Sequence, residues 1–436
     1  MQLIKKLLKK IVPEHALLFY HKVKASSAAL IYGFPATGML VVGVTGTKGK
    51  TSTANYVWSV LNAGGYNTGL ISTANFRLGD EEIINPYHMT MPDPFLIQKM
   101  LKKMKDSGIT SVVVEMTSEG MKQYRHAGIP VDIAIFTNLT PEHLTSHKGD
   151  FELYKQAKSA LFKALNHPKK VIDGKTIERI SIANADSEHA EYYLQFPADK
   201  KITYGLTRGD VKATGVIETA SGTSFWVDDE QFELSIPAGF NVYNALPALI
   251  VGTTLGISLD KIRAGLKKLT LIPGRMEKID EGQKYSVFVD YAHEPASLGA
   301  LLTAAHNLKY PDGKIILLFG GQGGGRDPRK RKPMAELAAK RADYVIITNE
   351  DPYQDDPQEI VDQIAGYVAE AGKKMNENLF AILERENAIR KALKLASEKD
   401  IVLVTGKGAE TTMMVKSGSI PWDERAIVRK LIHESL

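Results

Sequence analysis

The sequence has no cysteine. That absence excludes disulfide bonds, zinc sites built from thiolates, and cysteine nucleophiles. The chain also lacks any apolar run approaching the roughly 18 residues of a membrane-spanning helix, and it lacks the separate apolar stretch of a secretory signal. With 44% apolar and 24% charged residues, the composition is that of an ordinary soluble enzyme, which we expect in the cytoplasm. The length of 436 residues favours two to three domains.

Positive charge is in only slight excess. The chain has 55 Lys and Arg against 50 Asp and Glu, so its net charge is +5 (55 − 50). Residues 1–24 hold six Lys and one Glu, which is also +5, and the other 412 residues (436 − 24) therefore balance. Because a broad nucleic-acid surface needs clustered positive charge over a whole domain, we expect no nucleic-acid partner.

The excess charge lies in an amphipathic segment at the N-terminus that ends at Pro13. Five apolar residues fall at helical spacing and four lysines take the other face: Leu3, Ile4, Leu7, Leu8 and Ile11, against Lys5, Lys6, Lys9 and Lys10. We favour a short helix that packs on the domain behind it, with solvated lysines. The alternative is a helix that lies on an anionic membrane surface.

Residues 41–53 read VVGVTGTKGKTST and are the most informative segment of the chain. An apolar run predicts a buried strand, and a helical pattern follows a Gly-rich turn. A strand, a glycine loop, Lys50 and Thr51, and a helix together make a phosphate cradle. Backbone N–H groups face the anion, Lys50 reaches the outer phosphates, and the Thr51 hydroxyl is suited to Mg²⁺.

The glycine spacing of this loop differs from the strict GxxxxGK[ST] pattern. That pattern needs a glycine at Val44, whereas the glycines here are Gly43, Gly46 and Gly49. A Gly-rich connection with a chance Lys-Thr pair is the alternative. The order of strand, loop and helix favours the phosphate cradle.

Strand and helix signals alternate through the rest of the chain. Compact apolar runs predict strands at residues 111–115, 133–138, 286–290, 314–319, 344–348 and 401–405, and helical patterns include residues 94–105, 151–165 and 241–256. Short alternations at residues 200–236 predict a small antiparallel insert. We expect an α/β fold, with a mostly parallel sheet around the glycine loop and a second α/β domain from about residue 272.

Three polar residues follow the predicted strands of the first domain. Glu115 ends a strand at the edge where ligands meet open α/β sheets, and its carboxylate is a hard oxygen ligand suited to Mg²⁺. His143 lies just beyond the next strand, within reach of the same phosphates. Lys158, in the following helix, has the sequence context of an ordinary solvated lysine.

Seven motifs occur in an order and spacing that resemble the Mur ligases of peptidoglycan synthesis. They read TGTKGKTS, EMTS, FTNLTPEHLTSH with YKQAK, GRME, VDYAHEP, GGRD and GKGAE. The set is most similar to the UDP-N-acetylmuramoyl-tripeptide synthetase (MurE-like) branch. The resemblance covers roughly residues 40–436 and is highly specific, because all seven motifs agree.

The resemblance implies an ATP-dependent amide ligase in three parts. These are a short helical segment at 1–38, a central P-loop ATPase domain at 39–271 and a C-terminal Rossmann-like domain at 272–436. ATP phosphorylates a substrate carboxylate, an amine attacks the acyl phosphate, and the tetrahedral intermediate collapses to an amide with release of ADP and phosphate. The implied partners are a muramoyl peptide and a free amino acid, and we expect a monomer.

The resemblance also assigns roles at the nucleotide. Thr51, Glu115 and His143 resemble ligands of two Mg²⁺ ions. Lys158 resembles a lysine that the family carbamylates, which turns a cation into an anion that positions the second Mg²⁺. The implied catalytic residues are Lys50, His143, Lys158 and Arg275, the last resembling a linker arginine that reaches the γ-phosphate. The implied ATP contacts are Gly46, Thr47, Lys48, Gly49, Lys50, Thr51, Ser52, Asn241, Asn244, Arg275, Asp290 and His293.

Substrate contacts are implied on both sides of the reaction. For the muramoyl peptide they are Thr90 in HMTMPD, where Met91 replaces a family Thr, and Thr117, Ser118, Gln123 and Arg125 in EMTSEGMKQYR. For the amino acid they are Asp351, Gly406 and Glu410.

Two departures from the family pattern concern the substrates. The P-loop begins only about forty residues into the chain, whereas full-length members carry a larger uridine-binding N-terminal domain, so recognition of UDP is left open. Members that add meso-diaminopimelate carry Asp-Asn-Pro-Arg, and this chain has Glu350-Asp351-Pro352-Tyr353. Because Tyr353 cannot clamp a carboxylate as arginine does, diaminopimelate is not supported, and lysine or another amino acid stays open.

Two other functions fit part of the pattern. A folylpolyglutamate- or polyglutamate-type synthetase shares the fold, but the TGTKGKTS, TSEGMKQYR and GKGAE details argue against it. A non-catalytic nucleotide-binding subunit would not need the complete catalytic set. Residues 320–327 (GGQGGGRD) resemble a dinucleotide fingerprint, but we interpret them as the GGRD turn of the Mur ligases, without NAD.

Overall fold

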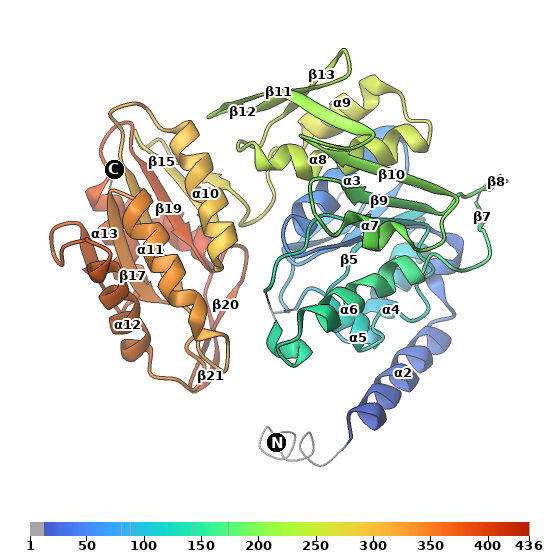
Figure 1. Ribbon diagram of the computed structural model, residues 1–436, viewed down its shortest axis with the longest axis horizontal. Coiled ribbons are helices and arrows are strands. Elements are labelled where there is room, and N and C mark those ends of the chain that lie inside the picture. Colours follow the sequence, from blue (N-terminus) through green and yellow to red (C-terminus); the bar gives the residue numbers. More distant parts are fainter. Residues whose placement is uncertain (1–12, 80, 88, 143, 173, 436) are drawn as a thin grey trace. The chain divides into compact units, whose positions relative to one another are not determined.

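The computed structural model describes residues 13–79, 81–87, 89–142, 144–172 and 174–435. The chain forms two compact units (Figure 1). The first comprises Met1–Ile83, Met89–Thr214 and Tyr243–Leu266, and the second Ile84–His88, Gly215–Val242 and Lys267–Leu436. No helix in the described part of the chain has the length and apolarity of a membrane span. The predicted helix at residues 3–11 lies outside the described residues.

The first unit is built on a mostly parallel sheet in the order β10-β9-β6-β1-β5-β2-β3-β4. The central strand β1 pairs in parallel with both β5 and β6, whereas β2 and β3 are antiparallel. β1, β5 and β6 are buried at every position, as their continuous apolar sequences require. The strands are β1 (Leu40–Thr45), β2 (Thr68–Ile71), β3 (Asn75–Leu78), β4 (Glu81–Ile84), β5 (Ser111–Glu115), β6 (Ile133–Phe136), β9 (Ile180–Asn184) and β10 (Lys200–Gly205), with a separate hairpin of β7 (Val171–Ile172) and β8 (Lys175–Thr176).

Two helices of the first unit, α4 and α6, begin after an aspartate that caps their first turn. Asp93 accepts a hydrogen bond from Phe95 N at 3.0 Å, and Asp150 accepts one from Glu152 N at 2.7 Å. Their apolar faces join the core of the sheet. The helices are α2 (Glu14–Ile31), α3 (Lys50–Gly64), α4 (Pro94–Asp106), α5 (Ser118–Lys122), α6 (Phe151–Lys163), α7 (Ala190–Leu194), α8 (Phe240–Thr254) and α9 (Leu259–Lys268), with 3-10 turns η1 (Pro35–Gly38) and η2 (Leu144–His147).

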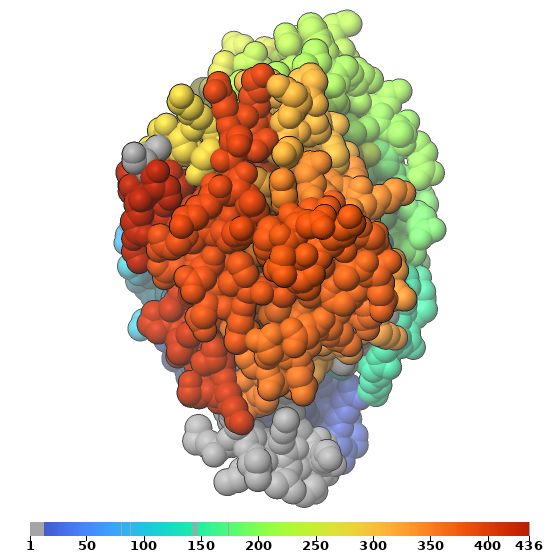
Figure 2. Space-filling view, turned by 90° about the vertical axis from the view of Figure 1, so that its left-hand side faces the viewer, coloured from blue at the N-terminus to red at the C-terminus, as the bar shows by residue number. Residues whose placement is uncertain are grey.

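The second unit carries a six-stranded sheet in the order β14-β15-β19-β16-β17-β18, parallel except for the β14–β15 pair. Figure 2 looks onto this unit. Its strands are β14 (Glu277–Ile279), β15 (Ser286–Asp290), β16 (Ile315–Gly321), β17 (Tyr344–Asn349), β18 (Leu379–Ala381) and β19 (Ile401–Thr405), with a hairpin of β20 (Thr412–Val415) and β21 (Gly418–Pro421). Its helices are α10 (Pro295–Leu308), α11 (Arg331–Arg341), α12 (Pro357–Glu370), α13 (Arg385–Leu395) and α14 (Glu424–His433), with a 3-10 turn η3 (Pro328–Lys330).

The predicted α/β fold class is confirmed. The predicted strands 111–115, 286–290 and 401–405 coincide with β5, β15 and β19. The predicted helix at 94–105 corresponds to α4 within one residue. Strongly apolar runs were located best, because a buried strand tolerates no polar interruption.

The predicted antiparallel insert at residues 200–236 is only partly correct. β10 pairs in parallel with β9, and Lys200 lies opposite Ile180. The strand β11 (Val211–Thr219) begins beside β10, also in parallel. β12 (Gly222–Val227) and β13 (Glu230–Leu234) form an antiparallel hairpin, as predicted, and β12 lies next to β11 in the sheet. The error arose because β9, α7 and β10 form a crossover unit, and strand direction follows from that connection rather than from composition.

Candidate active site

The loop that follows β1 lies at the carboxyl edge of the first sheet. β1 lies between β5 and β6, and Val44 is opposite both Glu115 and Ile135. The ends of these three strands therefore lie next to one another. In an open parallel sheet this is the edge at which ligands bind.

Two glycines of the loop hold conformations that a side chain would disturb. Gly46 has φ +150°, and a Cβ on it would lie 1.9 Å from Thr137 Oγ1. Gly49 has φ +81°, and a Cβ there would lie 2.3 Å from Asn244 Oδ1. The unusual glycine spacing thus follows from two close neighbours of the loop.

Residues after β6 fix the shape of the loop. Thr47 N donates to Asn138 O at 2.8 Å, and Lys48 N donates to Asn138 Oδ1 at 2.9 Å. Thr137 Oγ1 donates to Lys48 O at 2.6 Å. Sequence reasoning did not single out Thr137 or Asn138, although both lie within the FTNLTPEHLTSH motif. The loop is therefore held open as a preformed cradle.

Lys50, Thr51 and Glu115 lie together, as predicted from the sequence. Thr51 Oγ1 donates to Glu115 Oε2 at 2.9 Å, and Lys50 Nζ is 3.9 Å from Glu115 Oε1. Glu115 is buried and also accepts a hydrogen bond from Thr73 N at 2.8 Å. Ser52, which follows in α3, is buried as well. A cation, a hydroxyl and a carboxylate thus meet at the start of α3.

Lys158 is buried at the same loop, against its sequence context. It lies on α6, and its Nζ donates to Gly46 O at 2.6 Å and is 4.5 Å from the centre of the Tyr154 ring. Within the described residues it has no ion pair to a carboxylate. Burial, together with the nearby charge of Lys50, holds the pKa of Lys158 well below its ordinary value. The low pKa favours the neutral amine form of this side chain.

The oxygen donors here fit Mg²⁺. The Thr51 hydroxyl and the Glu115 carboxylate are hard ligands that lie 2.9 Å apart beside the cradle. The third predicted ligand, His143, lies outside the described residues. Among the residues that are described, no three His, Asp or Glu side chains converge on one position. Thr51 and Glu115 would thus supply two of the oxygen ligands of a Mg²⁺ ion bound here.

A second histidine of the same motif packs against this region. His147 is buried, its Nε2 lies 3.0 Å from Ser118 Oγ, and its ring is 5.3 Å from that of Tyr154. Burial lowers its pKa to about 4, so it is neutral at physiological pH. His147 thus connects the α5 residues to α6, a role that sequence reasoning did not assign.

The predicted muramoyl-peptide residues lie around α5. Thr90 Oγ1 lies 2.7 Å from Thr73 Oγ1, next to the residue that donates to Glu115. Thr117 caps α5 by accepting from Gly120 N at 3.1 Å. Arg125 donates to Gln123 Oε1 at 2.7 Å and to the Met91 carbonyl. These polar groups form a single neighbourhood in the first unit.

The two predicted adenine contacts differ in their surroundings. Asn244 belongs to the first unit, beside Gly49. Asn241 lies one helical turn earlier, in residues assigned to the second unit, and its Nδ2 donates to Pro237 O at 2.7 Å. The structure therefore brings Asn244 to the loop.

The predicted ATP contacts after the linker lie together in the second unit. Asp290 Oδ2 accepts from Met276 N at 2.7 Å, and the Arg275 guanidinium lies 4.5 Å from the centre of the Tyr291 ring. His293 Nδ1 donates to Tyr291 O at 2.7 Å. The GRME and VDYAHEP motifs thus pack on each other.

The predicted amino-acid residues also cluster, around a lysine that sequence reasoning did not name. Lys407 is buried, and its Nζ donates to Asp351 Oδ1 at 2.8 Å and to Glu410 Oε2 at 2.5 Å. These two carboxylates, together with Lys407, carry a net negative charge. Gly406 has φ +110°, which suits glycine.

Glu350 is an unusual carboxyl beside this cluster. It is buried, its Oε1 has no hydrogen-bond partner in the part of the chain that the structure describes, and a Cβ on Gly406 would lie 2.5 Å from its Oε2. Burial raises its pKa to about 7, although the charges of Arg385 and Lys330 act in the opposite direction. Glu350 is therefore partly protonated at neutral pH.

Glu350 gives the stability of the second unit a defined pH dependence. Its folded pKa of about 7 exceeds the ordinary 4.5, so the folded state holds a proton that the unfolded state releases. Stability should fall as pH rises from about 4.5 to 7 and stay level above. We expect Glu350→Gln to be more stable than the natural chain at pH of about 8, by at most about 3 kcal/mol, and similar at about 4.5. Urea unfolding at several pH values measures this.

The control for that experiment is Glu384→Gln, which changes an exposed glutamate at the start of α13. It should leave the pH slope of the free energy of unfolding unchanged. An identical slope in Glu350→Gln and in the natural chain would contradict the assignment.

Tyr353, at the position of the family arginine, has an arginine beside it. Arg326 Nη2 donates to Tyr353 Oη at 3.2 Å, and the Arg326 guanidinium lies 5.4 Å from the centre of the tyrosine ring. Sequence reasoning had noted Arg326 only as part of the GGRD turn. A guanidinium is thus present in this neighbourhood although residue 353 does not supply it.

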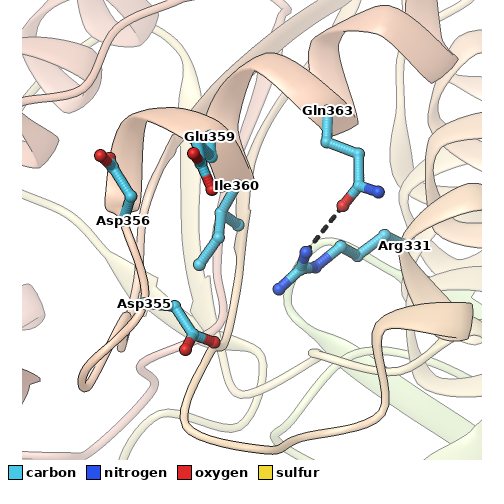
Figure 3. A pocket seen from close by; sticks show the side chains of 6 residues that line it. All are labelled: Arg331, Asp355, Asp356, Glu359, Ile360 and Gln363. Carbon is cyan, nitrogen blue, oxygen red and sulfur yellow. Dashed lines mark hydrogen bonds between the residues drawn. The ribbon is translucent and has the colours of Figure 1, made fainter.

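A hollow of about 340 Å³ lies elsewhere in the second unit, between α11 and α12. Figure 3 shows Arg331, whose Nη1 donates to Gln363 Oε1 at 2.7 Å, opposite acidic side chains. The lining residues are Arg331, Asp355, Asp356, Glu359, Ile360 and Gln363. None of the predicted site residues is among them.

Comparisons with known proteins agree with this geometry. Two family models match: the Mur ligase middle domain over residues 44–252, and the Mur ligase glutamate ligase domain over residues 274–408. A UDP-N-acetylmuramoyl-L-alanyl-D-glutamate–2,6-diaminopimelate ligase from Geobacillus kaustophilus (strain HTA426) is 36% identical over 95% of this chain and 83% of its own length. A UDP-N-acetylmuramyl-tripeptide synthetase from Roseiflexus sp. (strain RS-1) is 36% identical over 94% of this chain and 82% of its own length.

A solved structure of folylpolyglutamate synthase from Mycobacterium tuberculosis, complexed with ADP and AMPPCP, also superposes. The superposition covers 92% of this chain and 96% of the folylpolyglutamate synthase chain, with a TM-score of 0.68. The sequence identity is 18%, so this likeness concerns the fold alone.

Proposed function

The chain belongs to the Mur ligase family, and from this premise we propose that it is an ATP-dependent ligase that joins an amino acid to the carboxylate of a muramoyl dipeptide in peptidoglycan synthesis. The observation that carries the proposal is the cradle after β1. There Lys50 and the 2.9 Å pair of Thr51 and Glu115 lie at the carboxyl edge of the sheet. The names of its relatives, a tripeptide synthetase among them, support the acceptor.

The first unit binds the triphosphate and offsets its charge. The substrate carboxylate and the triphosphate are both anionic and repel each other. Lys50, with the N–H groups at the start of α3, stabilises the charge that spreads over the transferring phosphoryl group. The bond from this group to ADP breaks while a bond to the substrate carboxylate forms, which gives an acyl phosphate. Most of the catalysis is positioning.

We propose that Thr51, Glu115 and Lys158 hold Mg²⁺ with His143. The metal, when bound, supplies positive charge at the phosphate oxygens. Carbamylation of Lys158 is part of this proposal. Only a neutral amine reacts with CO₂, and burial lowers the pKa of the Lys158 amine, which favours that form. The carbamate would turn a neutral donor into an anionic oxygen ligand.

The second unit takes the amino acid. Asp351, Gly406 and Glu410 lie together around Lys407, and the net negative charge of this group attracts an ammonium. The amine, once deprotonated, attacks the carbonyl carbon of the acyl phosphate. The carbon–oxygen bond to phosphate then breaks and the amide forms.

Phosphate release tests this proposal. The purified chain is supplied with ATP, Mg²⁺ and UDP-N-acetylmuramoyl-L-alanyl-D-glutamate, and amino acids are added singly: lysine, ornithine, meso-diaminopimelate, alanine and glutamate. We expect release that requires both the acceptor and one amino acid. Diaminopimelate belongs in the panel because Arg326 lies beside Tyr353. Silence with every amino acid, and turnover with a folate or polyglutamate acceptor instead, would overturn the proposal.

We also propose that the chain acts as a monomer in the cytoplasm, divided into parts at 1–38, 39–271 and 272–436. Support comes from the separate apolar cores of the two sheets, each of which is closed by its own helices. Sedimentation over a range of protein concentrations tests the monomer.

A further inference from the structure

Helix α2 exposes a row of large apolar side chains. Phe19 is 69% exposed and Leu30 68%, and with Val23 they fall at spacings of four and seven residues along one line of the helix. Tyr20 and Ile31, eleven residues apart, lie next to this line and are 57% and 67% exposed. We call these five residues the α2 stripe.

The opposite face of α2 attaches it to the first unit through small residues. Ala25, Ala28 and Ala29 are fully buried, and α2 packs against α4. Lys24, on the flank, forms an ion pair with Asp93 in front of α4. A helix normally turns its large apolar residues inward, and α2 does the reverse. The α2 stripe therefore contributes little to the fold, and a contiguous apolar row on the surface indicates an interaction site.

The charge around α2 is mostly positive. Glu14 is the only acidic residue in the first 79 residues of the sequence. Its carboxylate forms ion pairs with Lys122, at 2.8 Å, and with Lys148. Hydrogen bonds from these two lysines lower the pKa of Glu14 to about 2. Lys22 is exposed on α2, and the sequence of residues 1–12 adds four more lysines. The surface that meets the α2 stripe must therefore be apolar inside and anionic at its boundary.

We propose that α2 docks this enzyme on the surface of an anionic lipid bilayer. The α2 stripe enters the boundary between headgroups and acyl chains, and the surrounding lysines meet the anionic headgroups. Apolar burial and lysine attraction are the two contributions that hold amphipathic helices at such a surface. The proposal concerns where the enzyme works, so it holds or fails independently of which amino acid the ligase adds.

Other occupants fit less well. A second copy of the chain would bring two sets of lysines together across the α2 stripe, and like charges in an interface are costly. Residues 1–12 could cover the α2 stripe with their own apolar face, but their four lysines would then enlarge the cationic surface rather than neutralise it. Both occupants are outcomes of the experiment below.

The test is co-sedimentation of the full chain with vesicles. One set is phosphatidylcholine alone, and the other contains roughly one third phosphatidylglycerol. We expect binding to the anionic vesicles only, weakened by salt. The variant Phe19→Ser/Leu30→Ser should bind at least about tenfold more weakly. The matched control is Val171→Ser/Ile217→Ser, whose side chains are 66% and 58% exposed and do not belong to α2, and it should bind like the natural chain.

Three outcomes would overturn the proposal. They are no binding to anionic vesicles, equal binding of the α2 stripe variant and the natural chain, or dimerisation that the variant abolishes without any vesicle binding. Deletion of residues 1–12 tests whether these residues occupy the α2 stripe instead of lipid. Weaker binding of the shortened chain to anionic vesicles supports the proposal, and stronger binding means that residues 1–12 cover the α2 stripe. The serine variants change exposed side chains outside the active site, so their phosphate release in solution should be unchanged and reports that each is folded.

Discussion

Replacing Lys158 by alanine should lower amino-acid-dependent phosphate release by roughly a thousandfold, within the range seen when one preorganised electrostatic group is removed. The physical reason lies in the burial of this amine. It lies at the glycine loop, donates to Gly46 O at 2.6 Å, and its pKa is well below the ordinary value. A short carboxylate such as formate should restore part of the activity, because it replaces the anionic oxygens of the proposed carbamate. A purely structural lysine would not be rescued in this way.

The matched control for this variant is Lys163→Ala, on the same helix α6 but with an exposed side chain. It should retain full turnover. Labelled bicarbonate gives a second readout: the natural chain should show a carbamate carbon signal that Lys158→Ala lacks. Unchanged turnover in Lys158→Ala would overturn the carbamate proposal.

Glu115→Gln should lower turnover by roughly a hundredfold and raise the Mg²⁺ concentration needed for half-maximal phosphate release. Glutamine keeps the shape of the side chain and one oxygen for Thr51 and Thr73, which both donate to Glu115 Oε2. It removes the negative charge that attracts the metal. Loss of that charge also leaves Lys50, 3.9 Å away, without its carboxylate partner.

The measurement is a titration of phosphate release with Mg²⁺. Glu152→Gln is the control, because Glu152 is an exposed glutamate on α6 whose change should leave the titration unaltered. If Glu115→Gln shows the same half-saturating Mg²⁺ as the natural chain, Glu115 is not a metal ligand and its role is to orient Thr51.

The parts of the site that depend on a local sequence pattern could be predicted from the sequence. A continuous apolar run predicts a buried strand, and a glycine loop between strand and helix predicts a phosphate cradle. Lys50, Thr51 and Glu115 were found in this way, because each follows the end of a strand and parallel strands bring such ends to one edge. The second unit was found from its own alternation of strands and helices.

The shifted pKa values of Lys158 and Glu350 were decided only by the tertiary structure. Nothing local distinguishes Lys158 from other lysines of an amphipathic helix, and its lowered pKa arises from burial beside a loop more than a hundred residues earlier. The raised pKa of Glu350 has the same origin, since Gly406 and Arg385 reach it from distant strands and helices. A pKa depends on everything packed around a group, and packing joins residues that the sequence keeps apart.

The direction of β10 and the exposure of α2 are two further features that only the tertiary structure decided. The composition of residues 200–236 suggested antiparallel pairing, whereas the crossover through α7 made β10 parallel. The sequence of α2 is rich in apolar residues, but only its packing on α4 through Ala25, Ala28 and Ala29 left Phe19 and Leu30 outside. Periodicity and turn chemistry are local and can be predicted from the sequence. Which face of a helix is buried, and how burial shifts the pKa values of the side chains there, depends on long-range contacts that form only when the chain folds.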